Sequence, residues 1–118
     1  MSTENTAPIE AFVHEQIACW NRGDKEAFFA AYRNIATDKL LIEYVGKPEA
    51  DGWPILEDMW AQSQEKIEVE ELLMIAAGDE VACHNRNNIL GTDQAIETVE
   101  LYQLSSGSLR VRYFIKMP

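Results

Sequence analysis

Residues 67–116, IEVEELLMIAAGDEVACHNRNNILGTDQAIETVELYQLSSGSLRVRYFIK, decide the fold. Apolar and polar residues alternate through most of this stretch, which is typical of strands buried on one face. The four predicted strands run from Ile67 to Ala76, Val81 to Leu90, Gln94 to Leu104 and Ser108 to Lys116. The links between them are short enough for hairpins, so neighbouring strands must be antiparallel. A sheet of this size is expected to curl.

Helical patterns dominate the part of the chain that precedes these strands. A first helix, capped by Thr6, is predicted because apolar residues recur at helical spacing over residues 9–20. Asp24 is expected to cap a second helix, and Trp53 to begin a third one. Between the second and third helices, LLIEYV at residues 40–45 predicts a strand that is buried on both faces.

The predicted order of elements is therefore ααβαββββ, within a single α+β domain that spans residues 1–118. Residues 1–6 are polar and without periodicity, so we expect them to be disordered. The helices are the only elements that can cover the concave face of the curled antiparallel sheet. Sheet and helices together should form a cone, and the open end of a cone is a pocket.

Net charge narrows the classes of partner. The 20 acidic and 10 basic residues give a formal net charge of −10. Such a surface repels phosphate backbones and anionic lipids, so nucleic-acid and membrane partners are disfavoured. Solubility is the simplest reason for the charge, and a specific cationic partner is the alternative.

Two cysteines, Cys19 and Cys83, lie far apart in core-like segments and have no metal-ligand spacing. We expect two buried free thiols in a reducing compartment, although the fold could also bring them together as a pair. The sequence shows no signal-peptide pattern and no apolar run as long as a membrane span. These features favour a cytoplasmic location.

Four segments together resemble the nuclear transport factor 2-like superfamily, including its SnoaL-like cyclases and ketosteroid isomerases. They are WNRGDKEAFFAAY (20–32), LLIEYVG (40–46), DGWPILEDMW (51–60) and VELYQLSSGSLRVRYF (99–114). The order and spacing of the segments carry the resemblance. It implies a cystatin-like, cone-shaped α+β barrel and a homodimer formed through the sheet. Because the superfamily contains enzymes, binding modules and transport factors, the resemblance implies a fold rather than an activity.

Glu43 is the first candidate catalytic residue because it interrupts an apolar strand. Its expected same-face neighbours, Leu41 and Val45, would remove water from the carboxylate, which suits a general base. The resemblance implies the same role, since ketosteroid isomerases carry their proton-shuttling carboxylate at this strand position. The alternative is a glutamate at the strand end that faces solvent or pairs with an arginine.

Glu100 is the second candidate catalytic residue. Alternation places it on one strand face with Thr98 and Tyr102. The resemblance implies a protonated acid here that donates a hydrogen bond to a developing oxyanion. Glu97, on the opposite face, is a rival that alternation alone does not exclude.

Gln16 lies within the apolar face of the first predicted helix, where a polar group needs a partner or a cavity. The isomerases carry a hydrogen-bonding tyrosine at the matching position. Glutamine is a poorer oxyanion stabiliser than a phenol, which argues against steroid-isomerase activity. The last strand has Tyr113 followed by Phe114, where SnoaL-like cyclases often have an aromatic residue followed by aspartate. This difference argues against polyketide-cyclase activity.

The strand segment CHNRNN provides further ligand-binding candidates. His84, Arg86 and Asn88 share one face of the strand and could hold an anionic or carbonyl ligand. We favour the alternative that they lie on the wet or dimer-forming face of the sheet, because antiparallel sheets commonly keep one polar face.

Aromatic residues complete the candidate pocket. Those selected as ligand-binding candidates are Trp20, Tyr32, Trp60 and Tyr102. At helical and strand spacing, such aromatic residues serve more often as plain core. The sequence has no HExxH motif, glycine-rich phosphate loop, nucleophile elbow or metal cluster, so no metal or nucleotide cofactor is expected.

The leading hypothesis from the sequence is cofactor-free proton transfer on an apolar, carbonyl-bearing small molecule. Glu43 would act as the base, and Glu100 and Gln16 would bind the substrate oxygen. The second hypothesis is a non-catalytic module for ligand binding or dimerisation. A protein-binding adaptor is the third and would require an exposed apolar patch.

Overall fold

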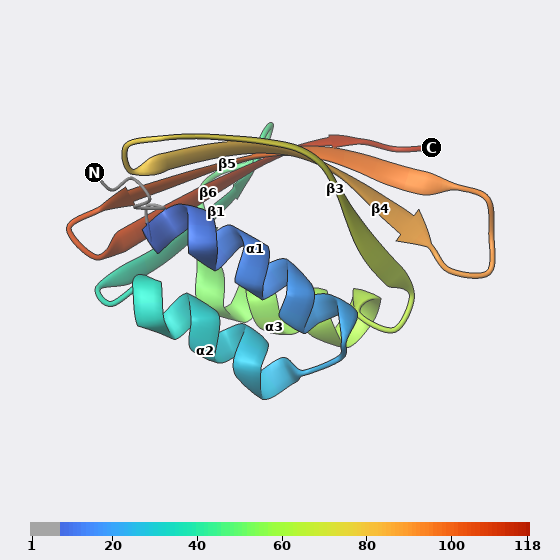
Figure 1. Cartoon of the computed structure of the whole chain (residues 1–118), viewed down its shortest axis with the longest axis horizontal. Helices are drawn as coiled ribbons and strands as arrows, with labels where there is room; N and C mark the ends of the chain where they lie inside the picture. The colour runs from blue at the N-terminus through green and yellow to red at the C-terminus, as the bar shows by residue number, and fades with distance from the viewer. Residues whose placement is uncertain (1–7) are drawn as a thin grey trace, which may run out of the picture.

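Three helices lie against one face of a curled six-stranded sheet in the computed structural model, which describes residues 8–118 (Figure 1). The expected disorder of residues 1–6 and the cap at Thr6 fall outside the described residues. In chain order the elements are α1 (Pro8–Asn21), α2 (Lys25–Ile35), β1 (Lys39–Tyr44), β2 (Ala50–Asp51), α3 (Gly52–Ser63), β3 (Ile67–Ala77), β4 (Glu80–Ile89), β5 (Ala95–Ser105) and β6 (Ser108–Lys116).

The starts of α2 and α3 follow from their caps. The Asp24 side chain accepts a hydrogen bond from the backbone N–H of Ala27 at 3.1 Å, which confirms the predicted cap of α2. Asp51 caps α3 in the same way, accepting from the N–H of Trp53 at 3.2 Å. The helix therefore begins at Gly52. This residue packs closely against β1, since a Cβ atom here would lie only 2.5 Å from Cγ of Leu40.

The strands follow the order β2-β1-β6-β5-β4-β3. Strands β3 to β6 form the predicted antiparallel meander. In contrast to the all-antiparallel prediction, β1 pairs with β6 in parallel, so the sheet is mixed. A long connection that includes α3 separates β1 from β3 in the chain, so β1 is not tied to β3 by a hairpin. It pairs instead with the free edge of β6, at the other side of the meander. Strand β2 was not predicted because its two residues lie in a run of turn formers.

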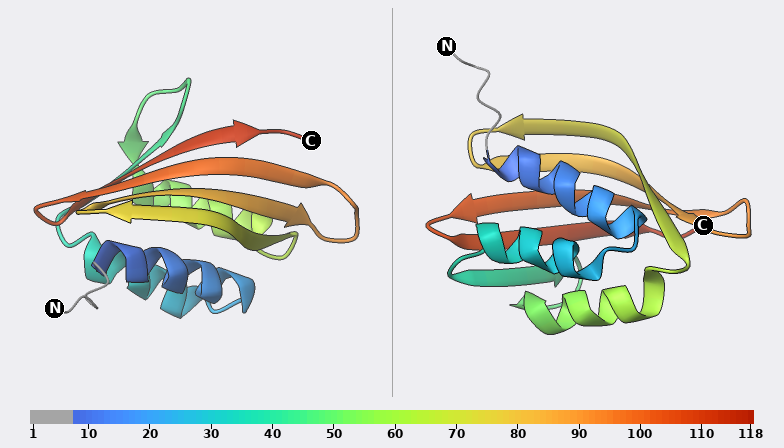
Figure 2. Two further views of the ribbon diagram at one scale, coloured as in Figure 1. Left: turned by 45° about the horizontal axis from the view of Figure 1, so that its top comes forward. Right: turned by 60° about the horizontal axis from the view of Figure 1, so that its bottom comes forward.

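The prediction that residues 40–45 are buried on both faces is wrong. Leu40 and Ile42 are almost fully buried beneath the helices, whereas Leu41 and Glu43 on the other face are only partly buried. Val45 is 41% exposed. Within residues 8–118 the three helices cover one face of the sheet only, so a continuous apolar run does not imply cover on both sides here (Figure 2).

The curl of the sheet creates the space that the helices cover (Figure 2). A bulge in β3, between Glu71 and Leu73, adds to the local twist. The sheet does not close into a barrel. Cys19 and Cys83 are both buried and free, as predicted. Among the described helices, none is long and apolar enough to cross a membrane.

Candidate functional site

A cavity of about 170 Å³ lies between the concave face of the sheet and the helices. Its walls are mainly apolar, with side chains such as Ile17, Trp20 and Phe28. The polar side chains that line it are Gln16, Tyr32, Tyr44, Ser63, Asn85, Asn87, Thr98, Glu100, Tyr102 and Tyr113. An apolar cavity with a few converging polar groups is the usual form of a small-molecule site. The volume is below the roughly 300–1,000 Å³ of drug-sized sites and is close to that of a cavity that holds a single six-membered ring.

Glu100 is the centre of the polar groups and is only 6% exposed. The Thr98 hydroxyl donates to its Oε2 at 2.7 Å, and the Tyr102 hydroxyl donates to its Oε1 at 2.6 Å. All three residues are on β5 at two-residue spacing, so their side chains share the concave face. The strand itself therefore supplies both hydrogen bonds that hold the carboxylate.

A second layer of hydrogen bonds supports these two donors. Gln16 of α1 donates from Nε2 to the Tyr102 hydroxyl at 3.3 Å and accepts a hydrogen bond from the Tyr32 hydroxyl at Oε1, also at 3.3 Å. Asn87 of β4 donates from Nδ2 to the Thr98 hydroxyl at 3.1 Å. Both branches of this network, from Tyr32 and from Asn87, run toward Glu100.

The buried tyrosines remain phenols across the neutral pH range. Burial raises the pKa of Tyr102 well above its usual value, and the negative charge of Glu100 raises it further. Burial also raises the pKa of Tyr32, with the same contribution from Glu100. Tyr113 has a raised pKa for the same main reason, burial, with nearby Tyr32 and Glu100 adding to it. These residues can therefore act as hydrogen-bond donors or acceptors, but not as anions.

Glu100 has no cationic neighbour in the part of the chain that the structure describes. Each ion pair among residues 8–118 involves a carboxylate other than that of Glu100. The side chains that line the cavity include no lysine, arginine or histidine. A buried carboxyl group that is held only by neutral donors is unusual in a purely structural role, because buried charged groups are usually paired.

Asn85 of β4 also lines the cavity and is 1% exposed. Its Nδ2 lies 3.8 Å from Sγ of Cys83. Its Oδ1 has no hydrogen-bond partner among the described residues. A buried acceptor without a partner is rare and needs an explanation.

Five of the sequence-predicted residues, Gln16, Trp20, Tyr32, Glu100 and Tyr102, line the cavity together. The indole N–H of Trp20 donates to the backbone carbonyl of Ile67 at 3.0 Å, so its polar group serves the fold. Trp60 does not line the cavity. It packs against the rings of Trp20 and Phe28, with centroids 5.3 and 5.1 Å away, and belongs to the core.

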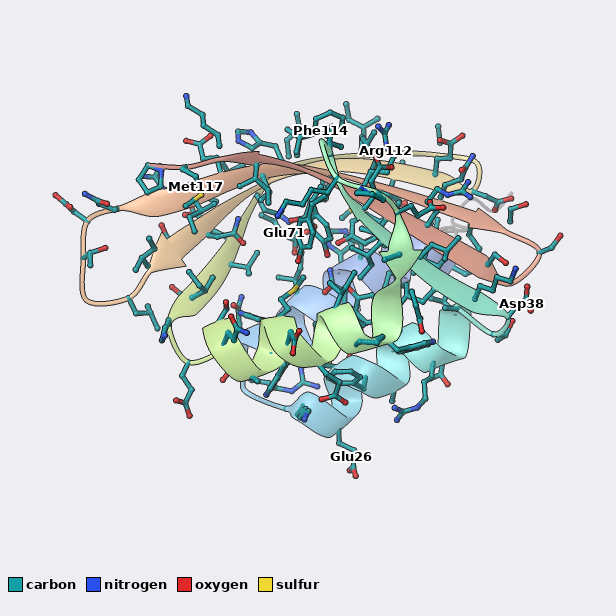
Figure 3. All side chains as sticks on the ribbon, turned by 180° about the vertical axis from the view of Figure 1, so that it is seen from behind. Glu26, Asp38, Glu71, Arg112, Phe114 and Met117 are labelled. Atoms are coloured by element: carbon teal, nitrogen blue, oxygen red, sulfur yellow. The ribbon has the colours of Figure 1, made fainter. Side chains whose placement is uncertain are left out.

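The structure places the other three candidates on the outer face of the sheet. Glu43 accepts a hydrogen bond at Oε1 from Nε of Arg112 at 3.0 Å, the alternative that the sequence had left open. Figure 3 shows Arg112 on the side of the sheet that faces away from the helices. His84 pairs with Glu97 at 2.8 Å on the same outer face, and Arg86 is exposed there.

For His84 and Arg86 the outer face is the alternative that we favoured from the sequence. Alternate residues of a strand point to opposite faces, so the residues that face the helices determine which residues face outward. In β4 the inward set is Cys83, Asn85 and Asn87, which excludes His84 and Arg86 from the cavity. The sequence did contain a signal for the inward set: Cys83 lies in a core-like segment, and Asn85 and Asn87 share its face.

Among the described residues, no group of three or more histidine, cysteine, aspartate or glutamate side chains could hold a metal ion. The polar groups of the cavity can accept and relay hydrogen bonds and can take up a proton at Glu100.

No protein-family model and no curated protein matches the sequence. Solved structures do match. A candidate ketosteroid isomerase from Kribbella flavida superposes with a TM-score of 0.74 at 14% identity, over 94% of this chain and 79% of the other. A protein of unknown function from Burkholderia xenovorans, described as nuclear transport factor 2-like, gives a TM-score of 0.72 at 15% identity, over 94% and 84%.

A third match is an epoxide hydrolase of the LEH-like type from M. tuberculosis. Its TM-score is 0.66 at 18% identity, over 96% of this chain and 85% of the other. At these low identities the matches show the fold alone. The chain therefore has the nuclear transport factor 2-like fold, as its sequence segments had indicated.

Proposed function

We propose that this protein binds a small, largely apolar carbonyl compound in the cavity and transfers one of its protons without a cofactor. Glu100 accepts the proton in this proposal, in place of Glu43. The observation that carries the proposal is a buried carboxylate that lines an apolar cavity and has no cationic partner among residues 8–118. The match to a candidate ketosteroid isomerase supports it by analogy only.

The proposed step moves one proton and one negative charge. Glu100 takes a proton from the carbon next to the carbonyl group, and the electron pair of that C–H bond moves into the carbonyl, giving an enolate. The negative charge thereby passes from the carboxylate to the substrate oxygen. Tyr102, which donates to the carboxylate before the step, can then turn its O–H toward the new anion.

Gln16 is a positioning residue in this mechanism. It donates a hydrogen bond to the Tyr102 oxygen and accepts one from the Tyr32 hydroxyl, and these two bonds hold the Tyr102 ring with its O–H directed at Glu100. The glutamine thus acts through a phenol rather than as the oxyanion donor itself.

Exchange of α-protons in D2O tests this proposal without a known substrate. Cyclohexanone is incubated with the protein, and the loss of its α-proton signal is followed by NMR. We expect the wild-type protein to accelerate exchange and Glu100→Gln to lose at least 100-fold of that acceleration, since general bases typically contribute 10²–10⁴-fold. Glu43→Gln is the matched control, because it makes the same change on the outer face. Equal rates for Glu100→Gln and the wild type would sink the assignment.

A non-catalytic module for dimerisation is the second candidate, and the outer face of the sheet favours it. Leu73, Val99 and Phe114 are each more than 40% exposed and lie in one row across the sheet, with His84 between the first two. Figure 3 shows Phe114 on this outer side. Such a row suits a second copy of the chain. Sedimentation that shows a dimer for the wild type and a monomer for Val99→Glu would support it, and a wild-type monomer would refute it.

A further inference from the structure

The polar groups closest to Glu100 offer a ligand mainly hydrogen-bond acceptors, whereas the hydroxyl groups of Tyr44, Ser63 and Tyr113 in the same lining can also donate. The hydroxyl protons of Tyr102 and Thr98 are committed to Glu100, and that of Tyr32 is committed to Gln16. The Tyr102 oxygen already accepts from Gln16 and the Thr98 oxygen from Asn87, so each of these two hydroxyl groups keeps only its remaining lone pair for a ligand. Glu100 retains lone pairs on both carboxylate oxygens.

Asn85 adds the strongest unsatisfied group to this set. Its Oδ1 is buried in the cavity wall without a partner among the described residues. Leaving such an acceptor unpaired is unfavourable, and a ligand O–H or N–H that reaches it removes that penalty. A ligand that presents only another acceptor leaves the penalty in place.

Asn85 and Glu100 lie close enough to contact one small molecule. In the antiparallel β4–β5 pair, Asn85 is opposite Thr98, and Cys83 is opposite Glu100. The two side chains are therefore diagonal neighbours on the same face, at a spacing of roughly 7–8 Å between backbone positions. A six-membered ring can present different edges to the two groups.

Within residues 8–118, no cationic side chain lines the cavity to pair with a negatively charged ligand. No lysine, arginine or histidine lines the cavity, the carboxyl group of Glu100 does, and the whole chain has a formal net charge of −10. An anionic ligand would lose its hydration without a cationic partner, whereas a cationic ligand that loses its hydration has the Glu100 carboxyl group as a partner, and a neutral ligand incurs no such penalty.

We infer that the cavity selects small molecules of zero or positive charge that carry an O–H or N–H donor, and that Asn85 is the residue that determines this specificity. The inference deepens the proposed function and rests on it for the site: a carbonyl substrate of this class carries a hydroxyl or amino group that Asn85 holds while Glu100 faces the carbon that loses the proton. Carboxylic acids are excluded as substrates.

A series of compounds with one ring tests the inference. Binding of cyclohexanol, cyclohexylamine, cyclohexanone and cyclohexanecarboxylate is measured by NMR titration on the wild type and on Asn85→Leu. We expect cyclohexanol to bind about 5- to 10-fold more tightly than cyclohexanone, which is the worth of one hydrogen bond to a buried acceptor. Cyclohexylamine should bind at least as tightly as cyclohexanol, and the carboxylate most weakly.

The two variants at position 85 separate the role of the amide oxygen from effects on folding. Asn85→Leu keeps the branched shape of the side chain, although it is larger, and removes the unpaired acceptor, so it should melt at a higher temperature than the wild type and lose the preference for cyclohexanol. Asn85→Asp retains acceptors only, so it should keep that preference and bind cyclohexylamine more tightly. If Asn85→Leu keeps the wild-type preference, or if the wild type prefers cyclohexanone, the inference is wrong.

The same compounds distinguish this inference from the proposed function. A wild type that prefers cyclohexanol but gives no Glu100-dependent exchange of cyclohexanone supports the ligand class and refutes the catalysis. A wild type that catalyses exchange but binds the carboxylate as tightly as the alcohol supports the catalysis and overturns the ligand class.

Discussion

Replacing Tyr102 with phenylalanine removes one oxygen atom at which two hydrogen bonds of the cavity meet. The Tyr102 hydroxyl donates to Glu100 at 2.6 Å and accepts from Gln16 at 3.3 Å. The residue is 1% exposed. The substitution thus affects a carboxylate and a buried amide together.

The expected loss of stability follows from those two partners. A hydrogen bond to a charged group contributes about 1.5–3 kcal/mol, and a buried N–H left without a partner costs about 1–3 kcal/mol. We therefore expect Tyr102→Phe to reduce the free energy of unfolding by about 2.5–6 kcal/mol, a large part of the 5–15 kcal/mol typical of a domain.

Tyr32→Phe is the matched control because it removes the same atom from a neighbouring ring. The Tyr32 hydroxyl donates a longer hydrogen bond, at 3.3 Å, to the uncharged Gln16 side chain. Its loss should cost about 1–2 kcal/mol. Urea unfolding followed by tryptophan fluorescence measures both variants at equal m-value. Equal losses for the two variants would refute the view that Tyr102 holds a charged carboxylate.

Two further properties follow from the structure. The pKa values of Tyr32, Tyr102 and Tyr113 are raised in the folded state, so the folded protein retains protons that the unfolded chain releases. The tyrosines contribute fully to the free energy of unfolding below about pH 10, and that free energy should fall above pH 10 by about 1.4 kcal/mol per pH unit for each tyrosine. A urea midpoint that stays constant between about pH 10 and 11 would contradict this expectation. Gly107 and Gly91 both have positive φ, but a Cβ at Gly107 would lie 2.5 Å from Oγ1 of Thr37, whereas a Cβ at Gly91 would meet nothing within 4 Å. Gly91→Ala should lower the free energy of unfolding by about 1–2 kcal/mol through backbone strain alone. Gly107→Ala should lower it by about 1–2 kcal/mol more, because of the clash with Thr37. Equal melting temperatures for the two variants would exclude the clash.

The sequence was sufficient for the fold because its local signals agree with one another. The alternation over residues 67–116 predicted the four strands of the meander, and helical spacing placed Gln16 on the inward face of α1. Alternation also placed Thr98, Glu100 and Tyr102 on one face, where the structure has them. These predictions needed only contacts between near neighbours in the chain.

The predictions that failed needed information from distant parts of the chain. LLIEYV is apolar at almost every position, so its phase cannot be determined from its own residues, and only the parallel pairing with β6 turns Glu43 toward Arg112. The polar strand segment CHNRNN has the same ambiguity. Its polar residues occupy both faces, so polarity alone could not separate Asn85 from His84.

Chemical-shift mapping of a bound ligand tests most directly whether the function of this protein lies in the cavity around Glu100. The ¹⁵N-labelled wild-type protein is titrated with cyclohexanol, and the shifts of backbone and side-chain amides are followed. We predict saturable shifts at the Asn85 side-chain amide and at the backbone amides of Thr98 and Glu100, which line the cavity. Shifts confined to His84 and Phe114 on the outer face, or no saturable shifts up to the solubility limit, would contradict the account.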